Sequence, residues 1–381
     1  MSKRLYLDLS IVQTVPPSNI NRDDAGTPKH ATYGGVRRAR VSSQAWKRAT
    51  RIEFAQAVPE ADRATRTKKI LELLTGRLEA RTELGGEDCR RLAAALLEPL
   101  GITKSAKKEE QSAYLLFFGK PQLDSIVDLV IDRAAELAQL GDTALKEALK
   151  GLDVSGVFTK GHPAEVALFG RMVADIPRLN VDAAVQVAHA LSTHPVTTEF
   201  DYYTAVDDES PDEETGAGMI GQVEFNSATL YRYATVGIHQ LRNNLSDEAE
   251  TVRTARRFVE SFALSMPTGH QNSFAHRTVP HLLLACLRTD QPVNLVSAFE
   301  QPVLGRTSGI AEQSMVRLAQ EADQMSQTWG LGAGLTLATY ASLGEGTDKV
   351  AEAFGASLPF PELLDRVQGS VGNWLRHGST R

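Results

Sequence analysis

The sequence has few of the features that would define a class at once. Only Cys89 and Cys286 are present among 381 residues, and two such distant cysteines are typical of reduced thiols in a cytoplasmic protein, not of a disulfide framework or a zinc site. No stretch approaches the roughly 20 apolar residues that span a bilayer. The basic N-terminus runs into Asp8 and Ser10 without an apolar segment. We therefore expect neither a membrane anchor nor a signal peptide.

Several common signatures are also missing. The sequence has no internal repeat, no low-complexity tract and no aromatic signature of the kind that RNA-recognition motifs use for stacking bases. The glycines at 330, 332 and 334 match neither a dinucleotide fingerprint nor a P-loop. His270, His276 and His281 have neither helix-face nor zinc-finger spacing and are interpreted as structural residues. We expect no cofactor and no bound metal.

The charges that are present are unevenly distributed. The whole chain carries −6, but its first 51 residues contain ten basic and three acidic residues, a net +7, which leaves −13 for the remainder. A hydrophobic fraction of 42% is ordinary for a folded protein with a large core. Because a basic footprint need only cover one face, this asymmetry favours nucleic-acid binding despite a pI near 5.9.

The N-terminal region predicts a strand, a long loop and a basic helix. Residues 4–12 alternate between apolar and polar side chains, which predicts a strand with one buried face. Residues 13–41 are predicted to form a loop with a hairpin at Gly34-Gly35. Ser42 or Ser43 is predicted to cap a helix. The basic face of that helix carries Gln44, Lys47, Arg48 and Arg51, and its apolar face carries Ala45, Trp46, Ala49 and Ile52.

The rest of the chain mixes helices and strands. Residues 60–150 have helical apolar spacing, with a charged connector at 104–110. Strands are predicted at 152–158, 166–174, 225–236 and 278–287, and helices at 181–191, 246–265 and 361–376. Residues 199–224 carry nine acidic residues and no Lys or Arg, which is typical of a protruding loop. Without its insertions, the order is strand, helix, strand, strand, helix, strand, which predicts an α+β, ferredoxin-like fold.

Several motifs resemble one family in the same order along nearly the whole chain. The motifs are Asn21-Arg22-Asp23-Asp24, Tyr33-Gly34-Gly35 with Arg37-Arg38-Ala39-Arg40, Ser42-Ser43-Gln44 with Lys47-Arg48-Ala49, Phe169-Gly170-Arg171-Met172, residues 188–194, 203–208, 224–225 and 231–234, and Asn294 to Glu300. Together they resemble CasC, the Cas-seven backbone subunit of the type I-E CRISPR surveillance complex called Cascade. Several ordered motifs are more specific than one short pattern.

The resemblance implies a hand-like subunit with an RNA-recognition-like palm, helical fingers and a β-hairpin thumb. The expected parts are palm with RNA-binding loop and helix (1–58), fingers (59–150), a palm and wedge region (151–195), thumb (196–224), and the rest of the palm with the C-terminal segment (225–381). Copies would polymerise along the spacer of a CRISPR RNA, and each thumb would kink the RNA so that its bases pair with target DNA. Other Cascade subunits are further implied partners. Base pairing would read sequence, while protein reads shape.

The resemblance also implies individual roles. The RNA-backbone contacts would be Arg22, Lys29, Ser42, Ser43, Gln44, Lys47, Arg48 and Arg51. Met172 would wedge beside a kinked base, although a methionine is by default a core residue. Met219 or Ile220 at the thumb tip would be its partner from a neighbouring copy.

Two alternatives remain at this point. A metal-dependent ribonuclease of the related type III backbone kind would use Asp23 or Asp24, whereas loop organisation by these aspartates is the simpler interpretation. A general RNA-recognition protein would bind short RNA as a monomer. Phe225, Tyr231 and Tyr233 could then be stacking platforms. The backbone role predicts no enzymatic activity.

Overall fold

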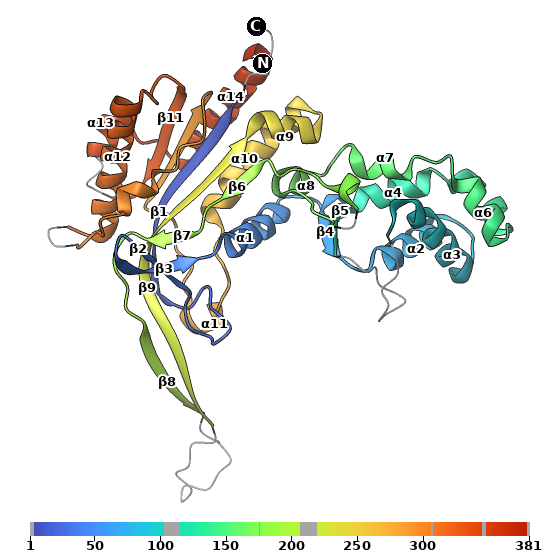
Figure 1. Ribbon diagram of the computed structural model, residues 1–381, viewed down its shortest axis with the longest axis horizontal. Coiled ribbons are helices and arrows are strands. Elements are labelled where there is room, and N and C mark those ends of the chain that lie inside the picture. Colours follow the sequence, from blue (N-terminus) through green and yellow to red (C-terminus); the bar gives the residue numbers. More distant parts are fainter. Residues whose placement is uncertain are drawn as a thin grey trace, which may run out of the picture. The chain divides into compact units, whose positions relative to one another are not determined.

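The computed structural model describes residues 4–102, 115–174, 176–205, 219–305, 308–344 and 348–378, without the side chains of residues 205, 219, 220 and 378. The chain divides into two compact units (Figure 1). The sheet unit comprises residues 1–53, 186–238 and 255–381, and the helical unit comprises residues 54–185 and 239–254. No helix in the described part of the chain has the length and apolar character needed to cross a membrane.

The sheet unit is built on one antiparallel sheet with the strand order β11-β10-β1-β9-β7-β3-β2. The strands are β1 (Tyr6–Ser18), β2 (His30–Tyr33), β3 (Val36–Val41), β7 (Ala190–Ser192), β8 (Glu199–Ala205), β9 (Met219–Gly237), β10 (Leu282–Arg288) and β11 (Leu335–Ser342), and β6 (Val185–Val187) also pairs with β9. The predicted first strand is confirmed, but it extends through two prolines to Ser18. It does so because β9 pairs with it as far as Ser18, across an irregularity after Val15.

Both faces of this sheet are covered. The helices of this part of the chain are α1 (Ser43–Gln56), α10 (Glu248–Leu264), α11 (Gln271–Phe274), α12 (Ile310–Trp329), α13 (Asp348–Phe354) and α14 (Phe360–Gly378). On one face, Trp46 of α1 packs among Val15, Val41 and Leu230. On the other, α12 covers Tyr231 and its neighbours. The prediction that β1 has a single buried face is therefore wrong.

Polar side chains of β1 are buried because they find partners under α12. Asp8 is buried and accepts a hydrogen bond from Tyr233 (3.0 Å), and the Ser10 hydroxyl lies 3.1 Å from that of Tyr231. Burial raises the pKa of the Asp8 carboxyl, although hydrogen bonds oppose this. Tyr231 and Tyr233 are consequently core residues and not exposed stacking platforms.

Strands β8 and β9 form a two-stranded ribbon at one end of the sheet unit. Their register runs from Glu199 opposite Phe225 to Ala205 opposite Met219, and Figure 1 shows this green and yellow ribbon extending beyond the sheet. Phe225 is only partly buried and its ring lies 5.8 Å from that of Phe274. Residues 206–218, which hold six of the nine acidic residues of the predicted loop at 199–224, lie outside the described residues, as does the connector at 104–110.

The helical unit confirms the predicted helices over most of residues 60–150. It contains α2 (Ile70–Arg81), α3 (Gly86–Leu97), α4 (Lys120–Asp128), α5 (Ala134–Ala138), α6 (Asp142–Leu149), α7 (Val154–Thr159), α8 (Ala164–Phe169) and most of α9 (Ile238–Leu245), with a small sheet of β4 (Ala64–Thr67) and β5 (Leu116–Gly119). Short 3-10 helices lie at Glu60–Asp62, Glu98–Leu100, Ile131–Arg133, Pro177–Leu179 and, in the sheet unit, Leu295–Phe299. Leucines from α2 and α3 form its core with residues of α4 to α7.

Three secondary-structure predictions are wrong. Residues 152–158 and 166–174 contain the short helix α7 and most of α8 instead of strands. Helix α7 begins at an N-cap, since Asp153 accepts a hydrogen bond from the Gly156 backbone (2.7 Å). Residues 181–191 hold β6 and part of β7 instead of a helix, because main-chain pairing with β9 determines their conformation. The periodicity of a short apolar run does not distinguish a helix from a strand.

Candidate nucleic-acid interface

The β2–β3 hairpin ends in a turn that requires glycine. Gly34 and Gly35 have positive φ values of 59° and 75°, and Tyr33 pairs with Val36 across them. A Cβ atom at Gly34 would lie 1.6 Å from the main-chain oxygen of Glu300. The predicted hairpin is confirmed, and the turn rests directly on the backbone of a distant segment.

Arg38 joins this hairpin to the same segment. Its side chain is fully buried (0% exposed) and donates hydrogen bonds to the carbonyl oxygens of Tyr33 (3.1 Å), Ser192 (3.1 Å), Phe299 (2.8 Å) and Glu300 (3.2 Å). Burial lowers the pKa of this guanidinium, which the four carbonyl dipoles nevertheless accommodate. Arg38 is therefore a structural cation that cannot meet a phosphate, unlike its neighbour Arg37, which is exposed.

The loop before the hairpin is organised by side-chain hydrogen bonds. Asp23 Oδ1 accepts from the backbone N–H groups of Ala25 and Thr27, both at 3.0 Å. The interpretation of Asp23 as a loop-organising residue is thereby confirmed. Asn21 then accepts from the backbone of Ser42 (2.8 Å), which ties the loop to the start of α1. Arg22 projects from this loop as an exposed side chain.

Helix α1 presents the predicted polar stripe. The Ser42 hydroxyl accepts from the Ala45 backbone (3.3 Å), so Ser42 is the cap and Ser43 is the first helical residue. Gln44 and Arg48 are exposed, and Lys47 and Arg51 are partly exposed. The opposite face is less completely buried than predicted, because Ile52 is 40% exposed.

Trp46 fixes the roll of α1 against the sheet. It is 0% exposed, and the buried guanidinium of Arg232 lies 3.7 Å from its ring centroid. Arg232 also donates to Gln13 Oε1 (2.6 Å) and to the carbonyl of Phe262. Burial lowers the pKa of Arg232 to about 9. With Trp46 held on the sheet, Lys47 and Arg48 face away from it.

Six basic side chains of this region have no acidic partner within the described part of the chain. Among the described residues, no carboxylate lies within salt-bridge distance of Arg22, Lys29, Arg37, Arg40, Lys47 or Arg48. Three of these arginines instead hydrogen-bond to histidines: Arg22 to His270 (2.6 Å), Arg37 to His30 (3.2 Å) and Arg40 to His189 (3.1 Å). In the helical unit, by contrast, Arg81 pairs with Asp128 at 2.7 Å. Within the described residues, these six basic positions thus carry positive charge that no salt bridge neutralises.

Met172 belongs to the helical unit. It is 84% exposed, so the default interpretation of a core methionine is wrong. Its neighbour Arg171 is buried and donates to the carbonyls of Phe158 and Leu179, both at 2.5 Å. Gly170 has a φ of 74°, and a Cβ there would lie 2.8 Å from the Val181 oxygen. Because the Val173 backbone N–H also donates to Asn180 Oδ1 (2.6 Å), the segment is anchored on both sides of this exposed apolar side chain. Met219 and Ile220 begin β9, and their side chains are not described.

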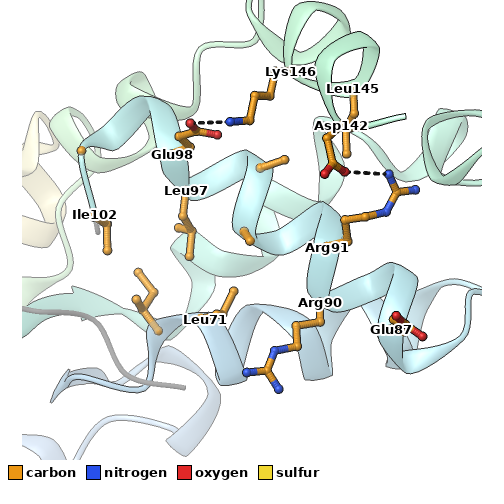
Figure 2. A pocket seen from close by; sticks show the side chains of 14 residues that line it. Leu71, Glu87, Arg90, Arg91, Leu97, Glu98, Ile102, Asp142, Leu145 and Lys146 are labelled. Carbon is orange, nitrogen blue, oxygen red and sulfur yellow. Dashed lines mark hydrogen bonds and ion pairs between the residues drawn. The ribbon is translucent and has the colours of Figure 1, made fainter. Parts of the chain in front are cut away.

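A pocket of about 600 Å³ lies elsewhere in the helical unit. Figure 2 shows its apolar wall, which includes Leu71, with Lys146 paired to Glu98 (2.8 Å) and Arg91 paired to Asp142 (3.4 Å) at its rim. None of the residues predicted to contact RNA lines it. Within the described part of the chain, no group of three or more His, Cys, Asp or Glu residues is arranged to hold a metal ion.

Comparison with known proteins assigns a family. A family model described as CT1975-like protein matches residues 7–365. The chain belongs to the CT1975-like family. A search of curated protein sequences gave no match.

Two solved structures are similar to this CT1975-like chain. A chain of a "CRISPR RNA-guided surveillance complex, pre-nicking" is 30% identical with a TM-score of 0.80, and the alignment covers 96% of this chain and 100% of that one. A chain of a "CRISPR RNA-guided surveillance complex" is 26% identical with a TM-score of 0.69, and the coverage is 96% and 99%. The whole fold of the CT1975-like chain is therefore of the kind found in such complexes.

Sequence reasoning missed the histidine partners of the basic surface of this CT1975-like protein. His30 lies within the predicted loop and His189 within a predicted helix, and both accept hydrogen bonds from arginines of β3. Arg38 was recognised only as part of a basic motif. Strand alternation gave a weak signal for its burial, because Arg37 and Arg38 must point to opposite faces.

Proposed function

We propose that this CT1975-like chain is the backbone subunit that binds the CRISPR RNA in a type I-E surveillance complex. The observation that carries the proposal is the group of six solvent-accessible cations on the loop, the hairpin and α1, for which the described residues provide no carboxylate within salt-bridge distance. Such a surface attracts the phosphates of any sequence, as a variable guide requires. Both similar structures are titled as RNA-guided surveillance complexes.

In this proposal the sheet unit is an RNA-recognition-like palm. Strands β10, β1, β9 and β7 are antiparallel neighbours, α1 follows β1, and α10 lies between β9 and β10. A β-α-β-β-α-β unit supplies these elements in this spatial order. The RNA does not lie on the sheet itself, because α12 covers the face that contains Tyr231 and Tyr233. It follows the loop, the hairpin and α1 instead, with Arg22, Lys29, Ser42, Ser43, Gln44, Lys47, Arg48 and Arg51 as its contacts.

The proposal includes polymerisation and kinking. Copies assemble along the spacer, the ribbon of β8 and β9 is the thumb, and Met172 wedges against the RNA together with Met219 or Ile220 of a neighbouring copy. An apolar side chain that is 84% exposed on an anchored segment supports the wedge role. The unstacked bases then pair with target DNA, and further Cascade subunits complete the particle.

The test is to co-express the chain with the proteins of its operon and a CRISPR array, then to measure the particle size and the length of the bound nucleic acid. The proposal expects a large particle that contains RNA of one discrete length. The double variant Lys349→Ala with Arg366→Ala is the control for loss of positive charge as such. It removes two charges from α13 and α14, away from the proposed RNA contacts, and should form the same particle. A monomer that holds no RNA, or random short RNA, would contradict the proposal.

We further propose that the chain acts without catalysis. The carboxylate of Asp23 is engaged by two backbone N–H groups, which supports a structural role. Asp24 is the remaining candidate for a ribonuclease. Incubation of purified complex with target RNA and Mg²⁺ or Mn²⁺ should leave the RNA intact. Cleavage that disappears in Asp24→Ala would establish the nuclease instead.

A further inference from the structure

A cluster of three basic side chains lies where β2, β3 and the segment before β7 meet. Arg40 of β3 reaches His189, with 3.1 Å between Nη1 and Nδ1. The same guanidinium donates from Nε to the carbonyl oxygen of His30 (3.2 Å). The backbone N–H of Arg40 donates to the carbonyl of Lys29 (2.9 Å). Lys29 also lies close enough to His189 to influence its titration. These contacts bring two permanent cations and one titratable ring together.

The Arg40–His189 hydrogen bond fixes the form of the imidazole. An arginine guanidinium only donates, so Nδ1 of His189 must accept, and the ring is then neutral with its proton on Nε2. Protonation at Nδ1 would replace the acceptor with a second donor and end this contact. The pair is therefore stable only while His189 is neutral.

The surroundings of His189 disfavour its charged form. Its pKa is lowered, first by partial burial and then by the positive charges of Arg40 and Lys29. Among the described residues, neither Arg40 nor Lys29 has a carboxylate within salt-bridge distance. His189 is nevertheless exposed to solvent, so an anion can reach it. An anion placed here would offset the repulsion between the positive charges and would accept hydrogen bonds from the Arg40 guanidinium and the His189 imidazolium.

We propose that Arg40 and His189, with Lys29, form a phosphate-binding subsite for the RNA backbone, and that His189 takes up a proton when the phosphate binds. The inference rests on the proposed RNA-binding function and assigns it a site beyond the stripe on α1. The phosphate accepts from the guanidinium, from the imidazolium and from the ammonium of Lys29. The charged groups that act on His189 are Arg40 from β3, which contacts the ring directly, and Lys29 from the preceding loop.

Proton uptake has a definite direction. The pKa of His189 is depressed in the free chain and rises in the complex, so more protons are bound in the complex between these two values. Affinity therefore increases as the pH falls through that window. One proton taken up changes the affinity by at most about tenfold per pH unit, and we expect a total gain of about three- to tenfold between pH 7.5 and pH 5.5.

The experiment measures the affinity of the full chain for a fluorescein-labelled single-stranded RNA of mixed sequence, by anisotropy at constant salt over this pH range. The key variant is His189→Gln, whose amide oxygen can accept from Arg40 but whose side chain does not titrate. We expect it to bind within about twofold of the wild type at pH 7.5 and to lose the gain at pH 5.5. Arg40→Gln should reduce the salt dependence by about one phosphate contact, a slope of about 0.7.

His30→Gln and His270→Gln are the matched controls, because both histidines also accept from arginines of this surface. They should retain the pH dependence. If the wild type binds RNA without pH dependence, or if His189→Gln keeps it, the subsite assignment is overturned while the RNA-binding function stands. If the wild type binds no RNA at any pH, the proposed function itself fails.

Discussion

The α-carbon of Gly34 lies so close to the backbone of Glu300 that a Cβ atom there would sit 1.6 Å from the carbonyl oxygen. The two residues are 266 positions apart in the sequence, and their contact sets the position of the hairpin that carries Arg37 and Arg40. The geometry of the candidate RNA surface therefore depends on the absence of a side chain at one position.

The first prediction concerns this contact. Gly34→Ala should destabilise the chain by about 2–4 kcal/mol, because it combines a positive φ with an overlap that the backbone must relieve. Gly35→Ala is the matched control, since its φ is also positive but no atom lies within 4 Å of the added methyl. The free energy of unfolding of Gly35→Ala should be only about 1 kcal/mol below that of the wild type. Equal losses of both variants in urea denaturation would show that the Glu300 contact is unimportant.

Arg38 leads to the second prediction. Arg38→Met should cost about 3 kcal/mol of unfolding free energy, because it removes a charge-assisted donor and leaves buried carbonyls of Ser192 and Phe299 without partners. Arg38→Lys should recover part of this loss. The exposed neighbour provides the comparison, as Arg37→Met should change stability by less than about 0.5 kcal/mol. A larger loss of stability in Arg37→Met than in Arg38→Met would contradict the buried role of Arg38.

The third prediction addresses the basic stripe on α1. The double variant Lys47→Ala with Arg48→Ala should weaken RNA binding to a similar extent for every spacer sequence, because phosphate contacts carry no sequence information. If both side chains contact phosphates, the slope of log affinity against log salt should fall by about 1.4. Anisotropy titrations with several unrelated RNAs measure both quantities. A loss that depends strongly on the spacer would exclude a pure backbone contact.

The fourth prediction is that a change at Met172 affects the binding of target DNA without affecting assembly on RNA. Because the side chain is exposed, Met172→Ser should leave the unfolding free energy within about 0.5 kcal/mol of the wild type. RNA loading should persist, whereas binding of complementary DNA by the assembled complex should weaken. Met315→Ser provides a contrast, since Met315 is buried in the core of the sheet unit and its replacement should destabilise the chain. Unchanged DNA binding by Met172→Ser would remove the wedge role.

The sequence predicted local features where periodicity and chemistry agreed. The cap at Ser42, the stripe on α1 and the turn at Gly34-Gly35 each rest on residues within a few positions of one another, and all three are present. Helices at 246–265 and 361–376 were also predicted close to their observed bounds, because their apolar spacing extends over several turns.

Long-range relationships escaped the same reasoning. In the sequence, Asp8 and Ser10 suggest an exposed face of the first strand. In the structure that face is covered by α12, more than 290 residues later in the chain, and both side chains have tyrosine partners on β9. The exposure of Met172 depends on the buried anchor at Arg171, and the pairing of Arg40 with His189 on the alignment of β3 beside β7. Such contacts are decided by tertiary packing, which no local pattern encodes.

The contact between the hairpin turn and the backbone of residue 300 also has an evolutionary consequence. Gly34 and Arg38 recognise main-chain atoms of residue 300, whose own side chain is exposed. Substitutions at residue 300 should therefore be tolerated, whereas most substitutions at positions 34 and 38 should destabilise the chain. A saturation library scored for assembled particles should record few tolerated substitutions at positions 34 and 38 and many at position 300. Homologous sequences should therefore show no covariation between residue 300 and the two positions that contact it.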